Sequence, residues 1–241
     1  MRTSPTGAME AFLCLPLLEI VMFSEARSAA HRLWRLGCRS YLHPNRGHSS
    51  ILTWLQQSDP IFSMGVDAAR PTFNFEPRYR VILLHRGDWT KGSGAPPEVK
   101  GLVWYMDESK MEGTGAGVYR QSVKRRLSFS LGRYATVFQA EIYAILACVY
   151  EIQSLDRPEK HVSVCSDNQT VLKSLQATRT TPLLFQQCHK ALNDISTRYV
   201  VGLYWVPGHA GMQGNEIADE LMRGGSVWGF LGPEPALGVC R

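Results

Sequence analysis

Hydrophobic residues form short runs and periodic stretches in the second half of this 241-residue chain. Residues 101 to 106 (GLVWYM) are almost all apolar, which is typical of a central strand buried on both faces. Residues 126 to 131 (RLSFSL) alternate apolar and polar positions, as expected of a strand with one face in solvent. Residues 137 to 153 change to the spacing of a helix. The pattern therefore predicts strands followed by a helix.

The same patterns predict the remaining elements of this region. They are a strand at 116–120, a strand at 160–166, a helix from about Gln169 with Asn168 as its N-cap, a helix opening near Thr181 and Pro182, a strand at 198–206, and a last helix from about Asn215. The order is three strands, helix, strand, two helices, strand and helix. Such an order predicts an α/β fold with a mixed five-stranded sheet and helical crossovers.

The flanking parts of the chain have a different character. Residues 17 to 36 carry apolar positions at helical spacing and predict an amphipathic helix. Residues 37 to 100 are rich in Pro, Gly, His and Arg and indicate an extended connector. We therefore divide the chain into an N-terminal helix and connector at 1–99, a folded domain at 100–225 and an irregular tail at 226–241.

The net charge of the chain excludes few classes of function. Twenty-six Lys and Arg residues against 21 Asp and Glu give a net charge of +5, which mildly favours a polyanionic partner. Cys38, His43 and His48 are too few and too loosely spaced to predict a zinc site, so we interpret them as loop residues.

Cysteine usage and hydropathy indicate where the chain resides. The six cysteines show no CxxC spacing, which favours a reducing compartment, and we expect the cytoplasm or the nucleus. The apolar run 11–23 is interrupted by Pro16 and Glu19 and is shorter than the roughly 20 residues of a membrane span. We therefore expect neither secretion nor a membrane partner.

Four acidic residues carry the candidate chemistry. Asp107 and Asp167 follow predicted strands, where ligands gather in open sheets. Glu141 lies on an otherwise apolar helical stripe, and Asp219 follows Asn215 by one helical turn. Singly, these residues are also typical of turns, helix rims and solvated faces. Together they predict one site that binds Mg²⁺ or Mn²⁺, because clustered carboxylates need a counter-charge.

His209 is a further candidate. It lies between Gly208 and Gly211, which permit backbone mobility. A histidine on such a loop beside a metal site is able to move protons near neutral pH, although a single loop histidine more often has no catalytic role.

Taken in order, these segments resemble the ribonuclease H type 1 family. The matching motifs are DES at 107–109, GAGVY, FQAEIYAI, SDNQTVLKSL and WVPGHAGMQGNEIADEL. The resemblance implies a metal-dependent phosphodiester hydrolase that cuts the RNA strand of an RNA/DNA hybrid with two Mg²⁺ or Mn²⁺ ions. The FQAEIYAI wording and the N-terminal segment also resemble non-LTR retrotransposon polyproteins after the reverse transcriptase. A polymerase domain absent from this chain is therefore an expected partner.

The resemblance also implies roles for individual residues. The metal-binding catalytic acids are Asp107, Glu141, Asp167 and Asp219. His209 assists proton transfer or product release, Asn215 orients the site, and the substrate contacts are Ser109, Thr136 and Gln169. The sequence departs from the family at Glu108, where Gly is common, and at Val137 and Phe138, where polar residues are common. These departures leave substrate affinity and rate open.

Two alternatives remain. A related exonuclease needs an Asp-x-Glu pair on its first strand, whereas Asp107 and Glu108 are adjacent and should occupy opposite faces of the strand. A catalytically weak or inactive nucleic-acid-binding remnant of a retrotransposon protein is the other alternative, against which the intact acids argue.

Overall fold

The computed structural model describes residues 70–90, 98–110, 113–132, 134–155 and 159–227, together with Met22, Ala29, Asp67, Pro96 and Leu237. The chain divides into two compact units, residues 1–65 and 66–241, and the described fold belongs to the second. Met22 and Ala29 are helical, and the rest of the helix expected at 17–36 lies outside the described residues.

A mixed six-stranded sheet forms the centre of the second unit. Its order is β2-β8-β6-β3-β4-β5. The strands are β2 (Arg80–Ile82), β3 (Leu102–Lys110), β4 (Thr114–Arg120), β5 (Arg125–Ser130), β6 (His161–Ser166) and β8 (Val200–Trp205). Strands β3, β4 and β5 pair antiparallel, whereas β2, β8, β6 and β3 run parallel. The predicted α/β class and mixed sheet are confirmed, but the sheet has six strands rather than the expected five, because β2 pairs beside β8.

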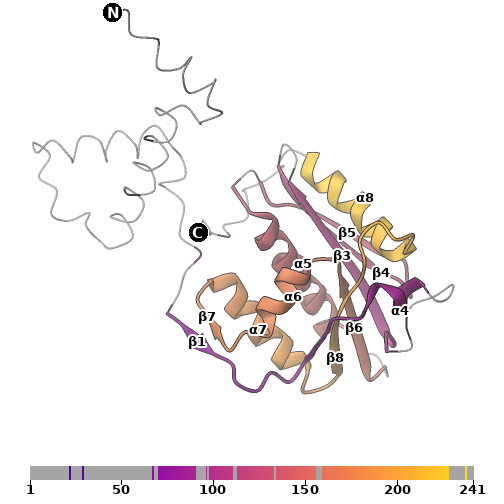
Figure 1. Ribbon diagram of the computed structural model, residues 1–241, viewed down its shortest axis with the longest axis horizontal. Coiled ribbons are helices and arrows are strands. Elements are labelled where there is room, and N and C mark those ends of the chain that lie inside the picture. The colour runs from indigo at the N-terminus through magenta and orange to yellow at the C-terminus, as the bar shows by residue number, and fades with distance from the viewer. Residues whose placement is uncertain are drawn as a thin grey trace, which may run out of the picture. The chain divides into compact units, whose positions relative to one another are not determined.

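Helices cover both faces of the sheet (Figure 1). They are α4 (Arg86–Thr90), α5 (Val137–Gln153), α6 (Gln169–Leu175), α7 (Leu183–Ile195) and α8 (Gln213–Val227). The core between the sheet and α5, α6 and α7 contains Trp104 and Met106 of β3, whereas Tyr105 packs in a second cluster with Ala218 of α8. Successive side chains of β3 therefore point alternately to the two faces of the sheet, as the pleat of a strand requires.

Local sequence explains where two helices begin. Thr136 caps α5 in a capping box with Gln139, whose side chain bonds the Thr136 backbone in return. Asn168 accepts from the Val171 backbone N–H at 3.1 Å and begins α6, as predicted.

A second small sheet pairs β1 (Thr72–Phe73) with β7 (Arg179–Thr180).

The structure differs from the sequence interpretation at both ends of the domain. Strand β2 lies within the expected connector and pairs in parallel with β8. Its three residues are too few to display a period, so the exposed edge of β8 decides their conformation. Helix α8 continues through Gly225, where a Cβ would meet the Phe129 carbonyl oxygen at 2.3 Å, so glycine permits close packing on β5 rather than ending the helix.

Two further expectations concern cysteines and membranes. Cys148, Cys165 and Cys188 are free and buried. Among the described residues, none of the helices combines the length and apolarity needed to cross a bilayer.

Candidate active site

Two parallel strands bring the first carboxylates together. The register of β3 and β6 ends with Met106 opposite Ser166, so Asp107 and Asp167 follow at the same edge of the sheet. Strand β3 continues to Lys110 in pairing with β4, whereas β6 ends at Ser166, so Asp107 lies where a crevice opens beside β3 and Asp167 lies at its edge.

Glu108 joins this pair. Asp107, Glu108 and Asp167 each offer a carboxylate oxygen, and the three atoms lie within 4.8 Å of one another. Asp107 continues the face of Tyr105 toward α8, and Glu108 continues the face of Met106 toward α5. Alternation therefore holds, but Asp107 and Glu108 lie beyond the last residue paired with β6, where side chains from both faces can reach around the sheet edge.

Hydrogen bonds orient the three acids. The Glu108 backbone N–H donates to Asp107 Oδ1 at 2.9 Å, and Asn168 Nδ2 donates to Glu108 Oε1 at 3.0 Å. Trp205 Nε1 donates to the Asp167 carbonyl oxygen at 2.9 Å. The Glu108 backbone and Asn168 thus orient the carboxylates of Asp107 and Glu108, and Trp205 of β8 fixes the backbone that carries Asp167.

Glu141 occupies a different environment. It is 0% exposed on α5, and neither carboxyl oxygen has a hydrogen-bond partner of good geometry among the described residues. Burial raises its pKa well above the usual range, the negative charge of Glu108 raises it further, and the nearby Ser166 hydroxyl opposes this. Glu141 is therefore next to Glu108 but outside the group that Glu108 forms with the two aspartates.

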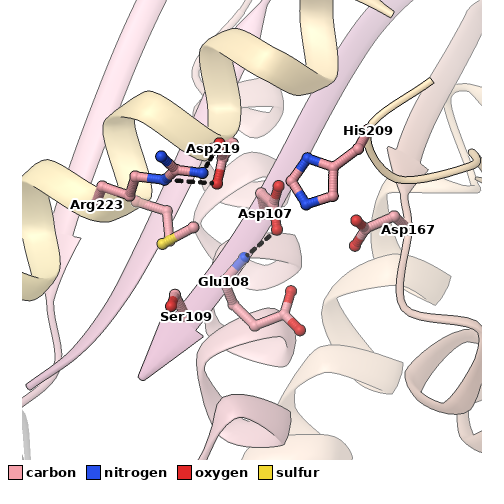
Figure 2. Close-up of a pocket in the computed structure, with 8 residues that line it drawn as sticks. Asp107, Glu108, Ser109, Asp167, His209, Asp219 and Arg223 are labelled. Carbon is pink, nitrogen blue, oxygen red and sulfur yellow. Dashed lines mark hydrogen bonds and ion pairs between the residues drawn. The ribbon is translucent and has the colours of Figure 1, made fainter. Parts of the chain in front are cut away.

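An open cavity of about 460 Å³ contains the triad. Its lining residues are Asp107, Glu108, Ser109, Asp167, His209, Asp219, Met222 and Arg223. Figure 2 shows Asp219 descending from α8 toward Asp107, with Arg223 bonded to it. Asp219 therefore lies on the cavity wall, although its carboxylate is not a member of the close triad.

The loop between β8 and α8 contributes His209 and holds Asp167. The His209 ring points from this loop toward Asp107 and Asp167 (Figure 2). Its backbone has φ 50°, a left-handed conformation that is uncommon outside glycine. The Asn215 side chain, buried at the start of α8, is close enough to the Asp167 carboxylate to lower its pKa. The loop thus places the His209 imidazole and the Asn215 amide beside the acids.

Burial and mutual repulsion dominate the electrostatics of the cavity. Burial, followed by the charges of Asp167 and Glu108, raises the pKa of Asp107 to about 8. Burial also raises the pKa values of Glu108 and Asp167, and the positive influence of His209 partly offsets the latter. The cavity therefore retains protons or accepts a cation in their place.

The predicted substrate contacts differ in their placement. Ser109 lines the cavity. The Thr136 hydroxyl is engaged in the α5 cap, where it accepts from the Gln139 backbone at 3.1 Å. Gln169 begins α6 and is not among the residues that line the cavity. Of these three, only Ser109 faces the acids.

Sequence reasoning missed two residues of the site. Glu108 was recognised as an added charge but not as a member of the acid group. Arg223 follows Asp219 by four positions in α8, a spacing that brings opposite charges together on a helix and that supplied the available signal.

Comparisons with known proteins agree with this arrangement. The family model of RNase H matches residues 99–227. The chain is 28% identical over 93 residues to a protein named Ribonuclease H from Jannaschia sp. (strain CCS1), covering 34% of this chain and 59% of that protein. The chain thus spans less than two thirds of that relative's length. The match to the family model covers more than half of the chain and includes every acid described above, so the chain belongs to the RNase H family.

Proposed function

We propose that this chain is an endoribonuclease that hydrolyses the RNA strand of RNA/DNA hybrids with divalent metal ions. The observation that carries the proposal is the group formed by Asp107, Glu108 and Asp167 in an open cavity. Membership of the RNase H family supports the reaction and the substrate class.

The donor set suits a hard divalent cation. All three members of the triad offer carboxylate oxygen, which Mg²⁺ and Mn²⁺ prefer. Glu108 Oε2 and Asn215 Oδ1 are buried without a hydrogen-bond partner among the described residues, and buried oxygens of this kind are satisfied by a cation or by water. Asp107 and Asp167 would hold the cation, and Asp219 on the cavity wall is placed to join them. Two ions are proposed by the family resemblance.

Bound metal would supply an activated water and electrostatic stabilisation of the leaving oxygen. The protein's own residues do the positioning. Asn215 lies beside the Asp167 carboxylate and lowers its pKa, and Arg223 holds Asp219 through an ion pair of 2.7 Å. His209 is placed to carry a proton between the cavity and solvent, because its ring reaches the acids from an exposed loop.

Hybrid recognition is expected to begin at the cavity rim. Ser109 is the predicted substrate contact that lines it, and a serine hydroxyl is able to bond a ribose hydroxyl or a phosphate oxygen. Discrimination of RNA from DNA then rests on the 2′-hydroxyl, which DNA lacks.

One observation favours the alternative of a weak or inactive nucleic-acid-binding remnant. Glu108 adds a negative charge inside the cavity, and an unneutralised acidic cavity repels phosphate. A retrotransposon origin and an absent polymerase partner belong to either proposal and are supported by the motif wording alone.

Cleavage assays distinguish the active nuclease from the inactive nucleic-acid-binding remnant. The purified full chain is incubated with end-labelled RNA/DNA hybrid, single-stranded RNA or duplex DNA, each with Mg²⁺ or with EDTA. We expect metal-dependent cleavage within the RNA of the hybrid and none of the other substrates. Products shortened stepwise from an RNA end would instead support the exonuclease alternative, and retention of the hybrid without cleavage would support the remnant.

A further inference from the structure

The small sheet of β1 and β7 has one face toward α7 and one face toward solvent. Thr72 pairs with Thr180. Phe73 pairs with Arg179, and the two members of each pair share a face of the sheet. Thr180 points inward, because it is buried and its hydroxyl lies 3.3 Å from Nε2 of His189 on α7. Phe73 and Arg179 therefore point outward.

The outward face carries a pair of exposed aromatic rings. Phe73 is 60% exposed and Phe75 is 75% exposed, and the two rings are stacked with their centroids 5.9 Å apart and their planes 7° apart. Arg179 is exposed beside Phe73, and its side chain makes no hydrogen bond or ion pair with a described residue. We call Phe73, Phe75 and Arg179 the aromatic patch. Two large rings that stack outside the core indicate a contact surface, whereas a single exposed ring does not.

A groove of about 640 Å³ adjoins the aromatic patch. It lies between residues 72–78 and α7, and Phe73 is one of its lining residues. Gln187 lines it from α7 with an exposed amide that is able to donate and to accept hydrogen bonds. None of the residues of the patch or the groove lines the acidic cavity, and Figure 1 shows β1 and β7 beside α7 and well apart from α8. The groove is therefore a separate site.

The charges around the patch and groove favour an anionic ligand that also has flat rings. Arg78 and Lys190 line the groove and, like Arg179, have no ion pair within the described part of the chain. Glu76 and Asp194 are the acids of the groove, so three cations stand against two acids. A single nucleic-acid strand presents base faces to aromatic rings and phosphates to cations. A duplex does not, because its bases are stacked on one another, and an apolar peptide would leave the cations unpaired.

We propose that the aromatic patch and its groove bind single-stranded nucleic acid, with bases stacked on Phe73 and Phe75 and a phosphate beside Arg179. The site goes beyond hydrolysis in the acidic cavity, while the choice of nucleic acid as its ligand rests in part on the proposed function. The small surplus of positive charge means that stacking, more than charge, determines the affinity. Removal of the two rings is therefore the most direct test.

Fluorescence anisotropy of the full chain with labelled DNA tests the proposal. The probes are single-stranded DNA of about 12 nucleotides, within the usual size of such sites, and duplex DNA of the same length, both in EDTA. The first variant combines Phe73→Ala with Phe75→Ala, and a second replaces both by Tyr. Arg179→Glu changes the patch without removing a ring. Tyr150→Ala is the matched control, because Tyr150 is an aromatic residue of α5 that is 54% exposed and outside the groove.

We expect the double alanine variant to bind single-stranded DNA at least about fivefold more weakly, and Arg179→Glu at least about threefold more weakly. The double tyrosine variant and Tyr150→Ala should stay within about twofold of the unmodified chain, and no variant should change duplex binding by more than that. Unchanged single-strand affinity in the double alanine variant, or an equal loss for single-stranded and duplex DNA, would overturn the proposal. An unmodified chain that does not bind single-stranded DNA would also overturn it and would favour a protein ligand.

The outcome is separable from that of the proposed function, because binding is measured without metal and without cleavage. A chain whose single-strand affinity depends on the two rings but that never cuts hybrid would refute the nuclease and leave the second site standing. A chain that cuts hybrid, and whose single-strand affinity does not depend on the rings, would refute only the second site.

Discussion

Arg223 contacts both carboxylate oxygens of Asp219, which lies one helical turn before it in α8. Its Nε donates to Oδ1 at 3.1 Å, and its Nη2 lies 2.7 Å from Oδ2. Among the described lining residues, Arg223 is the only Lys or Arg. The pair therefore keeps Asp219 neutralised within a cavity that otherwise collects acids.

Removal of Arg223 should leave Asp219 free to attract the metal. We expect Arg223→Ala to bind Mn²⁺ about two- to fivefold more tightly, because a guanidinium no longer competes for the carboxylate. The unfolding free energy of the metal-free protein should fall by no more than about 0.5 kcal/mol, since the pair is an exposed i,i+4 pair. Calorimetry and chemical denaturation measure the two effects. Arg223→Lys is the control that keeps the charge, and weaker Mn²⁺ binding in Arg223→Ala would contradict the account.

The raised pKa of Asp107 predicts how stability depends on pH. Burial, aided by the charges of Asp167 and Glu108, places this pKa at about 8, against roughly 3.9 for Asp in an unfolded chain. Between about pH 4 and 8, Asp107 in the folded protein therefore keeps a proton that Asp107 in the unfolded chain has lost. Its contribution to stability is complete below about pH 4 and is lost as the pH rises through about 8.

Thermal unfolding in EDTA should reveal this loss. We expect the melting temperature to fall between about pH 4 and 8, and Asp107→Asn to show a flatter profile because its amide does not titrate. Mg²⁺ should restore much of the stability at the alkaline end, since it replaces the lost proton as the counter-charge. Parallel profiles for the two proteins in EDTA would show that Asp107 does not hold the extra proton.

Gly208 leaves room for the Asp167 carboxylate. A Cβ at position 208 would lie 2.6 Å from Asp167 Oδ2, so Gly208→Ala should push the carboxylate out of the triad. We expect at least a 10-fold loss of hybrid cleavage, comparable to disturbing a residue that orients a metal ligand. Gly87→Ala is the control, because a Cβ there meets nothing within 4 Å. Equal cleavage rates for the two alanine variants would place Asp167 outside the catalytic group.

His209 combines a backbone conformation and a chemical role that two variants separate. Its φ of 50° is accessible to glycine at little cost but is unfavourable for alanine. His209→Gly should therefore be more stable than His209→Ala by roughly 1 kcal/mol. Both should cut hybrid more slowly while keeping measurable activity, because the acids remain. Denaturant titration and single-turnover rates test this, and unchanged rates in both variants would remove His209 from the mechanism.

The strands and helices that carry the acids were predictable because each displays a period or a cap. The apolar run before Asp107 and the Asn168 cap of α6 correspond to β3 and α6 as observed. Strand β2 was not predictable from its three residues, since its pairing depends on β8, more than 100 positions away. Pairings between distant segments leave no local periodicity.

In the acid group, too, the sequence predicted what depends on neighbouring residues and did not predict what depends on contacts between distant segments. Asp107 and Asp167 were predicted together because each stands at the end of an apolar run, and the structure places Asp107 within β3, just past its pairing with β6, and Asp167 directly after β6. The alternation rule correctly assigned Asp107 and Glu108 to opposite faces, but it says nothing about how far a Glu side chain reaches beyond the sheet edge. That reach, together with the enclosure of Glu141 by α5 packing, became visible only in three dimensions.

The most direct measurement of the central claim is single-turnover cleavage of an RNA/DNA hybrid by the full chain and by Asp107→Asn, both in Mg²⁺. The account predicts cuts within the RNA strand by the unmodified chain and at least about a 100-fold lower rate for Asp107→Asn, because a metal ligand should matter more than the outer residues that orient it. Cleavage of the hybrid by Asp107→Asn at the unmodified rate, with the protein folded, would contradict it.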